Sequence, residues 1–240
     1  MTSWHSGRLC GFDLETTGVD VESDRIVTAC VVQCRGGQPT TSATWLADPG
    51  IEISEGAAAV HGITTERARA EGRPAAEVVE QVTTALTRAV WDGIPIVAMN
   101  ASFDLTMLDR ECTRHGVPAP WAATTPLIVD PRVLDKQVDR YRRGKRTLSA
   151  LCDHYQVALD GAHSADGDAI AACRVAWRIG TQHPNIGDAD LRELHNLQVT
   201  WAAEQAEGLR EHFARTPGKE HQAASVRGEW PLIPRPRTAS

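Results

Sequence analysis

The sequence predicts an α/β fold in which helices cover a mixed β-sheet. Two patterns predict this fold. Runs rich in β-branched residues follow one another near the N-terminus, and helical and short apolar segments alternate farther along the chain. The chain has 240 residues with 42% hydrophobic content, which suffices for one sizeable core. We therefore expect one principal domain of about 180 residues with a C-terminal appendage.

Three antiparallel strands are the simplest interpretation of the N-terminal part. The first contains the stretch GFDLETTG at 11–18, where two acids interrupt an otherwise apolar strand. The second, at 25–34, is rich in β-branched residues, and the turn signal RGGQPT separates it from the third, at 41–47. These strands form the hairpin section of the expected sheet.

The pattern then changes to helices and short buried strands. A helix is predicted at 75–90, where apolar residues recur at helical spacing behind Pro74. A buried strand at 95–100 and a helix from Ser102 to a stop signal at Gly116 follow it. Strands and helices therefore alternate after the hairpin section.

The remainder of the chain supplies one more strand and several helices. A short apolar strand at 127–130 precedes a basic loop, and two helices are expected at 147–156 and 168–182. A long helical stretch from about 188 to 215 comes next, and its imperfect apolar stripe suits packing on the core. The expected parts are a main domain over 1–183, a C-terminal helical extension over 184–216 and a proline-containing tail over 217–240.

Composition limits the classes of protein and partner. The net charge of −6 and the pI near 5.8 mean that nucleic acid would have to be bound through a local basic patch. The six cysteines have no paired spacing, which indicates free thiols in a reducing compartment and argues against zinc. No signal-peptide pattern or membrane-length apolar run is visible. We expect a cytoplasmic protein with no membrane partner.

Asp13 and Glu15 lie two residues apart in the first strand. In a strand such residues share one face, while Phe12 and Leu14 point to the other. Two carboxylates this close repel each other unless both reach solvent, one holds a proton, or a cation lies between them. Of these alternatives, a divalent cation such as Mg²⁺, which prefers carboxylate oxygens, would make the acid pair part of a functional site.

Further acids and a histidine follow in chain order. Asp104 comes just after the predicted strand at 95–100, where loops at strand ends often carry functional groups. His163 and Asp168 are five residues apart, and Asp168 lies at the start of a predicted helix. Taken singly, each has an ordinary alternative as a capping or surface group.

In this order the residues resemble the DEDD superfamily of 3′-to-5′ exonucleases, specifically the histidine-containing DEDDh, or DnaQ-like, subgroup. That subgroup includes the proofreading subunit of bacterial replicative DNA polymerase. The resemblance runs from about Arg8 to Ile179 and is carried by the motifs FDLETTG, VHGIT, NASFD and H-x4-D. It implies a ribonuclease H-like fold and metal-dependent hydrolysis of phosphodiester bonds.

The resemblance also implies roles for individual residues. Asp13, shared between two divalent cations, either Mg²⁺ or Mn²⁺, would bind them with Glu15, Asp104 and Asp168. His163 would be the general base. The expected reaction releases nucleoside monophosphates from DNA 3′ ends by a two-metal mechanism. The alternatives are an exoribonuclease that trims RNA 3′ ends and a catalytically idle binding module of a replication or repair assembly.

Several residues are candidates for contact with single-stranded or frayed 3′ ends. Phe103 would stack on a terminal base or, as readily, belong to the core. His61 would contact the substrate or organise the turn that follows it, and the backbone at Thr16 and Thr17 would bind the terminal nucleotide or simply form a turn. Asn100, beside the second acidic motif, completes this group.

The basic run DRYRRGKR at 139–146 is the best candidate for phosphate contact in an acidic protein, and we assign Arg142, Arg143 and Arg146 to it. The alternative is a solvated surface. Four acids outside the metal motifs are expected to be surface or capping groups: Asp130, Asp135, Asp139 and Asp153. A protein partner for the C-terminal helix or tail is a further hypothesis.

Overall fold

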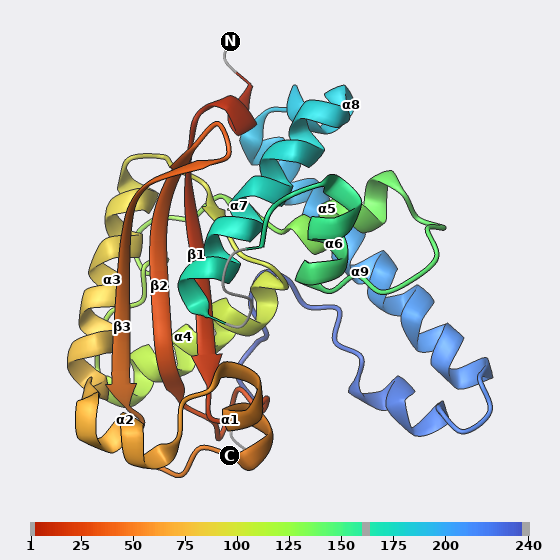
Figure 1. The fold of residues 1–240 in the computed structure, drawn as a ribbon. Helices are drawn as coiled ribbons and strands as arrows, with labels where there is room; N and C mark the ends of the chain where they lie inside the picture. The colour runs from red at the N-terminus through yellow and green to blue at the C-terminus, as the bar shows by residue number, and fades with distance from the viewer. Residues whose placement is uncertain (1–2, 160–163, 237–240) are drawn as a thin grey trace.

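The computed structural model describes residues 3–159 and 164–236. Over these residues six strands form one mixed sheet in the order β4-β3-β2-β1-β5-β6 (Figure 1). The strands are β1 (Arg8–Thr16), β2 (Ile26–Arg35), β3 (Gln38–Asp48), β4 (Arg73–Pro74), β5 (Ile96–Val97) and β6 (Ile128–Val129).

The sheet has an antiparallel and a parallel section that meet at β1. Strand β1 pairs antiparallel with β2, which pairs antiparallel with β3. On its other side β1 pairs parallel with β5, and β5 pairs parallel with β6. The three consecutive antiparallel strands predicted from the sequence are confirmed, and β1 lies where the two sections join.

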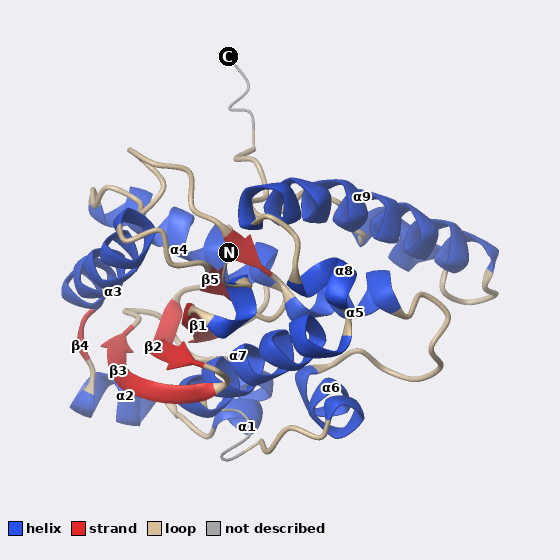
Figure 2. Cartoon of the chain, turned by 90° about the horizontal axis from the view of Figure 1, so that it is seen from above, coloured by secondary structure: helices blue, strands red, loops and turns tan. Residues whose placement is uncertain are grey.

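Helices cover both faces of the sheet, which confirms the predicted α/β class (Figure 2). The helices are α1 (Glu55–His61), α2 (Thr65–Glu71), α3 (Ala75–Trp91), α4 (Ala101–His115), α5 (Pro131–Val138), α6 (Leu148–Tyr155), α7 (Ala165–Gln182), α8 (Pro184–Gly187) and α9 (Leu191–Arg215). Two short 3₁₀ segments, Trp4–Ser6 and Glu220–Ser225, accompany them. None of these helices combines the length and apolarity that crossing a bilayer requires.

The alternation of side chains along β1 divides the core into two halves. Phe12 and Leu14 lie in the half that contains the apolar face of α3 and much of α4. Leu9 lies in the other half, which α7 fills with small side chains and which α5 and α6 complete. The strand that carries the acidic motif is therefore buried between two helical layers.

Three helices were not predicted from the sequence. Helices α1 and α2 occupy the segment around the VHGIT motif, which the sequence suggested only as a turn. Helix α5 occupies the start of the segment expected to be a basic loop, and Asp130 caps it while Pro131 takes its first position. All three are only seven or eight residues long, too short for a clear helical period.

Helix α9 and the segment after it pack against the main body. On α9, the His195 ring accepts a hydrogen bond from Ile128 N at 3.1 Å, and Gln198 bonds both flanks of β6, at Ile128 O and Asp130 N. These side chains bond the backbone of an edge strand that would otherwise lack partners. Farther along, Trp230 is buried in the core, so the tail is anchored to the body there.

Candidate active site

Strand β1 presents Asp13 and Glu15 on one face, as their spacing predicts. Both carboxylates are partly buried, while Phe12 and Leu14 point into the core on the opposite face. Each acid is thus held in place by a strand whose other face is locked by packing. Movement of the strand that carries these carboxylates would disturb a close-packed core.

Helix α7 approaches this face closely because residue 11 is glycine. A Cβ atom at Gly11 would lie 2.8 Å from Ala169 O and 2.8 Å from Cys173 Sγ, both on α7. Only a residue without a side chain permits this distance. Asp168 lies in the first turn of α7, next to Ala169, so the close approach brings it to β1.

Three of the four predicted carboxylates form a cluster. Asp13, Glu15 and Asp168 each offer one oxygen atom, and these oxygens lie within 4.8 Å of one another. An all-carboxylate donor set is the kind that Mg²⁺ and Mn²⁺ prefer. The residues therefore fit a divalent cation.

Asp104 lies outside this set of three but beside it. It is 4% exposed, in the first turn of α4, and its Oδ1 accepts a hydrogen bond from Leu14 N at 3.1 Å. Leu14 separates Asp13 from Glu15 in β1, so this bond fixes the Asp104 carboxylate against the acidic motif. The structure thus gathers all four predicted acids around one end of β1.

The electrostatics of the site disfavour four negative charges. Burial raises the pKa of Asp13 well above its usual range, and the carboxylates of Asp104, Asp168 and Glu15 raise it further. Burial likewise raises the pKa of Asp104, and burial together with Asp168 raises that of Glu15 to about 7. In the described part of the chain no Lys or Arg forms an ion pair with Asp13, Glu15 or Asp104. A bound divalent cation would relieve this repulsion.

Asp130 supports the site in a way the sequence did not reveal. It is 2% exposed and caps α5, so of the two expected alternatives, a surface or a capping group, the structure shows the cap. Its carboxylate accepts hydrogen bonds from the amides of Asn100 (3.2 Å), Ala101 (2.9 Å) and Arg132 (2.9 Å) and from the indole of Trp230 (3.3 Å). It thereby fixes the start of α4, the helix that carries Asp104. The Asp-Pro pair was the available signal in the sequence.

His61, at the end of α1, lies beside the end of β1, where Thr16 and Thr17 are found. The Ile63 amide donates to His61 Nδ1 at 3.2 Å, and His61 Nε2 lies 3.3 Å from Thr16 O. This geometry favours the turn-organising alternative for His61. Thr17 N donates to Arg25 O at 3.0 Å, so this amide is already bonded within the protein. Substrate contact by Thr16, Thr17 or His61 remains a prediction.

Asn100 and Phe103 lie at the start of α4, beside Asp104. Asn100 has a left-handed backbone (φ 64°), and its Oδ1 accepts a hydrogen bond from Arg132 Nη1 at 2.6 Å. Phe103 is half-buried and packs at the edge of the core. Both alternatives for Phe103 stay open, because a half-buried ring at this position serves packing and still reaches solvent.

The structure corrects the assignment of the basic run. Arg142 Nη2 lies 2.8 Å from a carboxylate oxygen of Asp135, and Arg146 also bonds that oxygen. Asp135 is fully buried, so it is not a surface acid, and the two guanidinium groups are mostly buried with it. Arg142 and Arg146 therefore neutralise Asp135 and are not free for phosphate. Arg143 is exposed, and its phosphate contact remains a prediction.

His163, the predicted general base, lies outside the described residues.

The family of the chain follows from comparison with other proteins. Residues 10–176 match the exonuclease family RNase T. The chain belongs to this family. The prediction of a DEDD exonuclease, a hydrolase acting on phosphodiester bonds, is thereby confirmed at the level of the family.

Relatives with curated descriptions include PolC-type DNA polymerase III proteins. The one from Halalkalibacterium halodurans is 26% identical over 229 residues, which cover 86% of this chain and 15% of that protein. The one from Lactococcus lactis is 25% identical over 193 residues, covering 79% of this chain and 11% of that protein. The chain thus spans only a small part of these relatives.

The fold is similar to that of exonuclease I. A structure of E. coli exonuclease I in complex with a dT13 oligonucleotide matches with a TM-score of 0.64 and 20% identity, over 76% of this chain and 43% of that chain. Another exonuclease I structure matches with a TM-score of 0.66 and 19% identity, over 76% and 42% of the two chains. The ribonuclease H-like fold expected from the motifs is therefore confirmed.

Proposed function

We propose that the protein is a metal-dependent 3′-to-5′ exonuclease that releases nucleoside monophosphates from the 3′ ends of DNA. The observation that carries this proposal is the gathering of Asp13, Glu15 and Asp168 within 4.8 Å, with Asp104 hydrogen-bonded to the strand between the first two. Burial and neighbouring carboxylates raise the pKa of Asp13, Glu15 and Asp104, so keeping these acids charged costs stability in the metal-free protein. Such a cost is typical of a functional site.

Each acid has a defined task in this proposal. Asp13, Glu15 and Asp168 would hold one divalent cation, and Asp13 together with Asp104 would hold a second. When bound, two Mg²⁺ or Mn²⁺ ions neutralise charge on the attacking and leaving oxygens of a phosphodiester. The Leu14 amide holds the Asp104 carboxylate in place, so that the ligands are oriented before substrate arrives.

His163 would remove the proton from the attacking water. A histidine of ordinary pKa, about 6.5, is largely neutral at pH 7 and able to accept that proton. Its place in chain order, five residues before Asp168, supports this role. The four carboxylates need no help from the imidazole to bind metal, so His163 would act on the water alone.

DNA with a single-stranded or frayed 3′ end is the proposed substrate. The PolC-type relatives carry the name of a DNA polymerase, and one matching exonuclease I structure holds a dT13 oligonucleotide. Both observations favour DNA over RNA. RNA 3′-end trimming is the alternative, since a terminal 2′-OH requires only small changes in a pocket.

The experiment is hydrolysis of 5′-labelled DNA and RNA oligonucleotides of the same sequence in Mg²⁺. We expect a ladder of DNA products shortened from the 3′ end, release of nucleoside monophosphates, and no reaction in EDTA. Faster shortening of the RNA would favour the exoribonuclease alternative. No shortening of either strand, in a protein that is folded, would contradict the proposal and favour an idle binding module. The Asp104→Asn variant controls for contaminating nuclease.

A further inference from the structure

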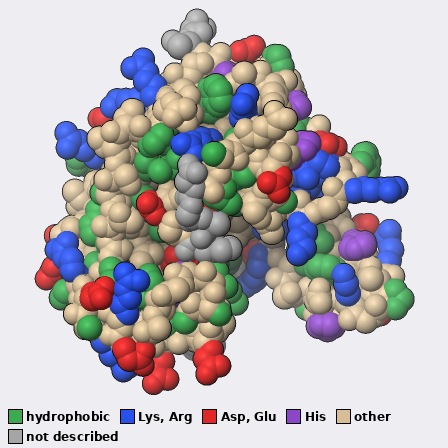
Figure 3. All heavy atoms as spheres, in the orientation of Figure 1, with side chains coloured by type: hydrophobic (Ala, Val, Ile, Leu, Met, Phe, Trp, Pro, Cys, Tyr) green, Lys and Arg blue, Asp and Glu red, His purple; other side chains and the backbone are tan. Residues whose placement is uncertain are grey.

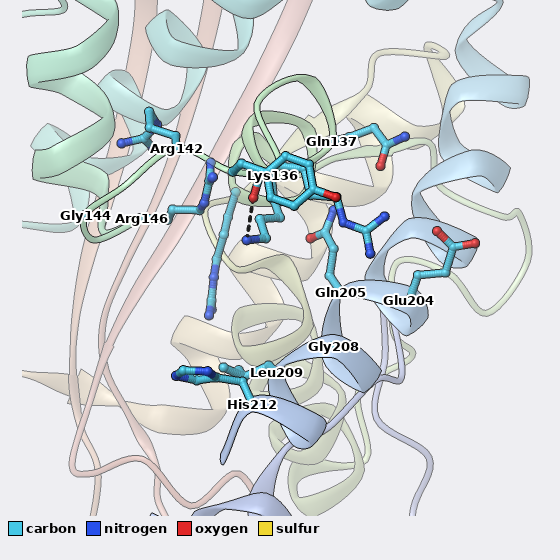
Figure 4. Close-up of a pocket in the computed structure, with 13 residues that line it drawn as sticks. Lys136, Gln137, Arg142, Gly144, Arg146, Glu204, Gln205, Gly208, Leu209 and His212 are labelled. Carbon is cyan, nitrogen blue, oxygen red and sulfur yellow. Dashed lines mark hydrogen bonds between the residues drawn. The ribbon is translucent and has the colours of Figure 1, made fainter. Parts of the chain in front are cut away.

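A concave, basic surface lies between α5 with the loop at 139–147 and the middle of α9. It encloses a cavity of about 480 Å³. Figure 4 shows that Lys136 lines it from the side of α5, while Gln205 and His212 line it from α9. Arg132 and Arg140 complete its basic wall. We call this surface the α5–α9 groove.

Three cations of the groove form no ion pair with a described carboxylate. Within the described ranges, Arg132, Lys136 and Arg140 have no carboxylate at ion-pair distance, unlike Arg142 and Arg146 on Asp135. Lys136 Nζ donates instead to the backbone carbonyl of Arg140 at 2.9 Å (Figure 4).

The surroundings of the groove are basic as well. Among the described residues that line it, Glu204 is the one acid. Burial lowers the pKa of Lys136, and the charges of Arg146 and Arg140 lower it further, as expected in a positive field. Several Lys and Arg side chains gather on this side of the molecule, over the loop and α9 (Figure 3). The groove is thus a local positive region in a protein of net charge −6.

An exposed aromatic ring borders the same groove. Tyr141 is 87% exposed, and the Arg140 guanidinium lies 6.0 Å from the centre of its ring. A ring beside cations is suited to stacking on a nucleic-acid base. Charge and ring together match a single strand better than a small anion, which would use the charge alone.

The groove adjoins the active site through one hydrogen bond. Arg132, on its wall, donates to Asn100 Oδ1 at 2.6 Å. Asn100 immediately precedes α4, whose first turn carries Phe103 and Asp104. When the 3′-terminal nucleotide of a single strand lies at Asp104, the basic surface is available to the nucleotides on its 5′ side.

We propose that the α5–α9 groove binds the phosphate backbone of the single-stranded nucleic acid whose 3′ end lies in the active site. The inference rests on the proposed function for the identity of the ligand. Lys136 and Arg140 contact phosphates, and Tyr141 stacks on a base. Short substrates, which fill only the active site, do not use the groove.

The test compares a groove variant with a charge-matched control. The groove variant is Lys136→Gln with Arg140→Gln. The control is Arg35→Gln with Arg88→Gln, which removes two exposed cations from elsewhere on the surface. Fluorescence anisotropy with labelled oligo-dT of about 16 nucleotides, in EDTA, measures binding without hydrolysis. Circular dichroism checks that both variants fold.

We expect the groove variant to bind the long oligonucleotide about tenfold more weakly than the parent at low salt. The slope of log affinity against log salt should fall by about 1.4, since each contact with a single strand contributes about 0.7. Tyr141→Leu should weaken binding about fivefold and leave that slope unchanged. The control should match the parent. Equal affinity and slope in the groove and control variants would overturn the inference.

Failure of the inference and failure of the proposed function give different results. Hydrolysis in Mg²⁺ of an oligonucleotide of about four nucleotides reports on the active site alone. We expect the groove variant to retain the parent's kcat and KM with this substrate and to show a raised KM with the long one. A parent that binds the long strand through the groove but hydrolyses neither substrate would contradict the proposed function. A groove variant with the parent's KM for the long strand would contradict the inference.

Discussion

Two groups of buried acids in this protein have opposite surroundings. Asp135 in α5 is fully buried, and Arg142, Arg146 and the hydroxyl of Tyr155 bond its two oxygens. Asp13 is partly buried and Asp104 is buried, but the charges that shift the pKa of both are other carboxylates. Burial alone therefore does not show whether an acid is structural or functional. The sign of the charges next to the acid distinguishes the two roles.

The difference indicates what each group requires. Asp135 has its positive charge supplied by the chain, so it ties the loop at 139–147 to α5 and contributes to stability. Among the described residues, Asp13, Glu15 and Asp104 form no ion pair with Lys or Arg, and a cation from solution would relieve the repulsion between them. We therefore regard Asp135 as structural and the acids at β1 as functional. Variants of each group test this difference.

The largest expected effect is on turnover. Asp13→Asn should reduce exonuclease turnover in Mg²⁺ by about 10³, because it removes a metal ligand worth several kcal/mol in the transition state. The same change should raise the free energy of unfolding of the metal-free protein, since it relieves carboxylate repulsion. Turnover close to the parent's would contradict the metal assignment. Asp153→Asn, an exposed acid outside the cluster, is the matched control.

Asp135→Asn should have the converse result. It leaves two mostly buried guanidinium groups without their carboxylate, so the free energy of unfolding in urea should fall by about 3 kcal/mol. Turnover per folded molecule should stay near the parent value, because Asp135 is not part of the acidic cluster. Unchanged stability would show that the pair with Arg142 and Arg146 is not structural.

The basic run should divide into structural and exposed residues. Arg146→Ala should lower the free energy of unfolding by about 2 kcal/mol, since it removes one of the two guanidinium groups that pair with the buried Asp135 carboxylate. Arg143→Ala should change it by less than about 0.5 kcal/mol, because Arg143 is exposed. Urea denaturation of the two variants side by side measures this. Equal losses would refute the division.

The smallest expected effect is a dependence of stability on pH. Burial and Asp168 raise the pKa of Glu15 from 4.5 to about 7. The resulting stabilisation is complete below pH 4.5 and is lost as the pH rises from 4.5 through 7, because over this range the unfolded chain has given up a proton that the folded protein still holds.

Metal-free protein should therefore gain about 1 kcal/mol from Glu15 between pH 8 and pH 6, a value reduced by the partial exposure of this side chain. Urea denaturation in EDTA at the two pH values measures the gain, and Glu15→Gln is the control that should lack it. A parent and a variant with the same pH dependence would show that Glu15 does not hold a proton in the fold.

Local patterns in the sequence were sufficient to predict the acidic motif and the described strands other than the two-residue β4 (Arg73–Pro74). Asp13 and Glu15 share a face because strands have a period of two, and β-branched runs identified β2 and β3. Helix α3 followed from its apolar spacing. These features depend only on neighbours along the chain.

Contacts between segments that are distant along the chain could not be predicted from the sequence. Trp230 reaches Asp130 across 100 residues, and nothing near Trp230 indicates that it is buried there. Arg142 and Arg146 are close in sequence to Asp135, yet whether they neutralise it or meet solvent depends on the burial of α5. Burial of a charge is a property of the folded core, and a charge run looks the same in both cases.

Calorimetric titration with Mn²⁺ measures whether the acids at β1 bind a divalent cation. Three proteins are compared: the parent, Asp13→Asn and the exposed-acid control Asp153→Asn. We predict that the parent and the control bind Mn²⁺ with the same affinity and that Asp13→Asn loses this binding while remaining folded. A parent that binds no Mn²⁺, or an Asp13→Asn variant that binds it as tightly as the parent, would contradict the claim that the acids at β1 form a metal site.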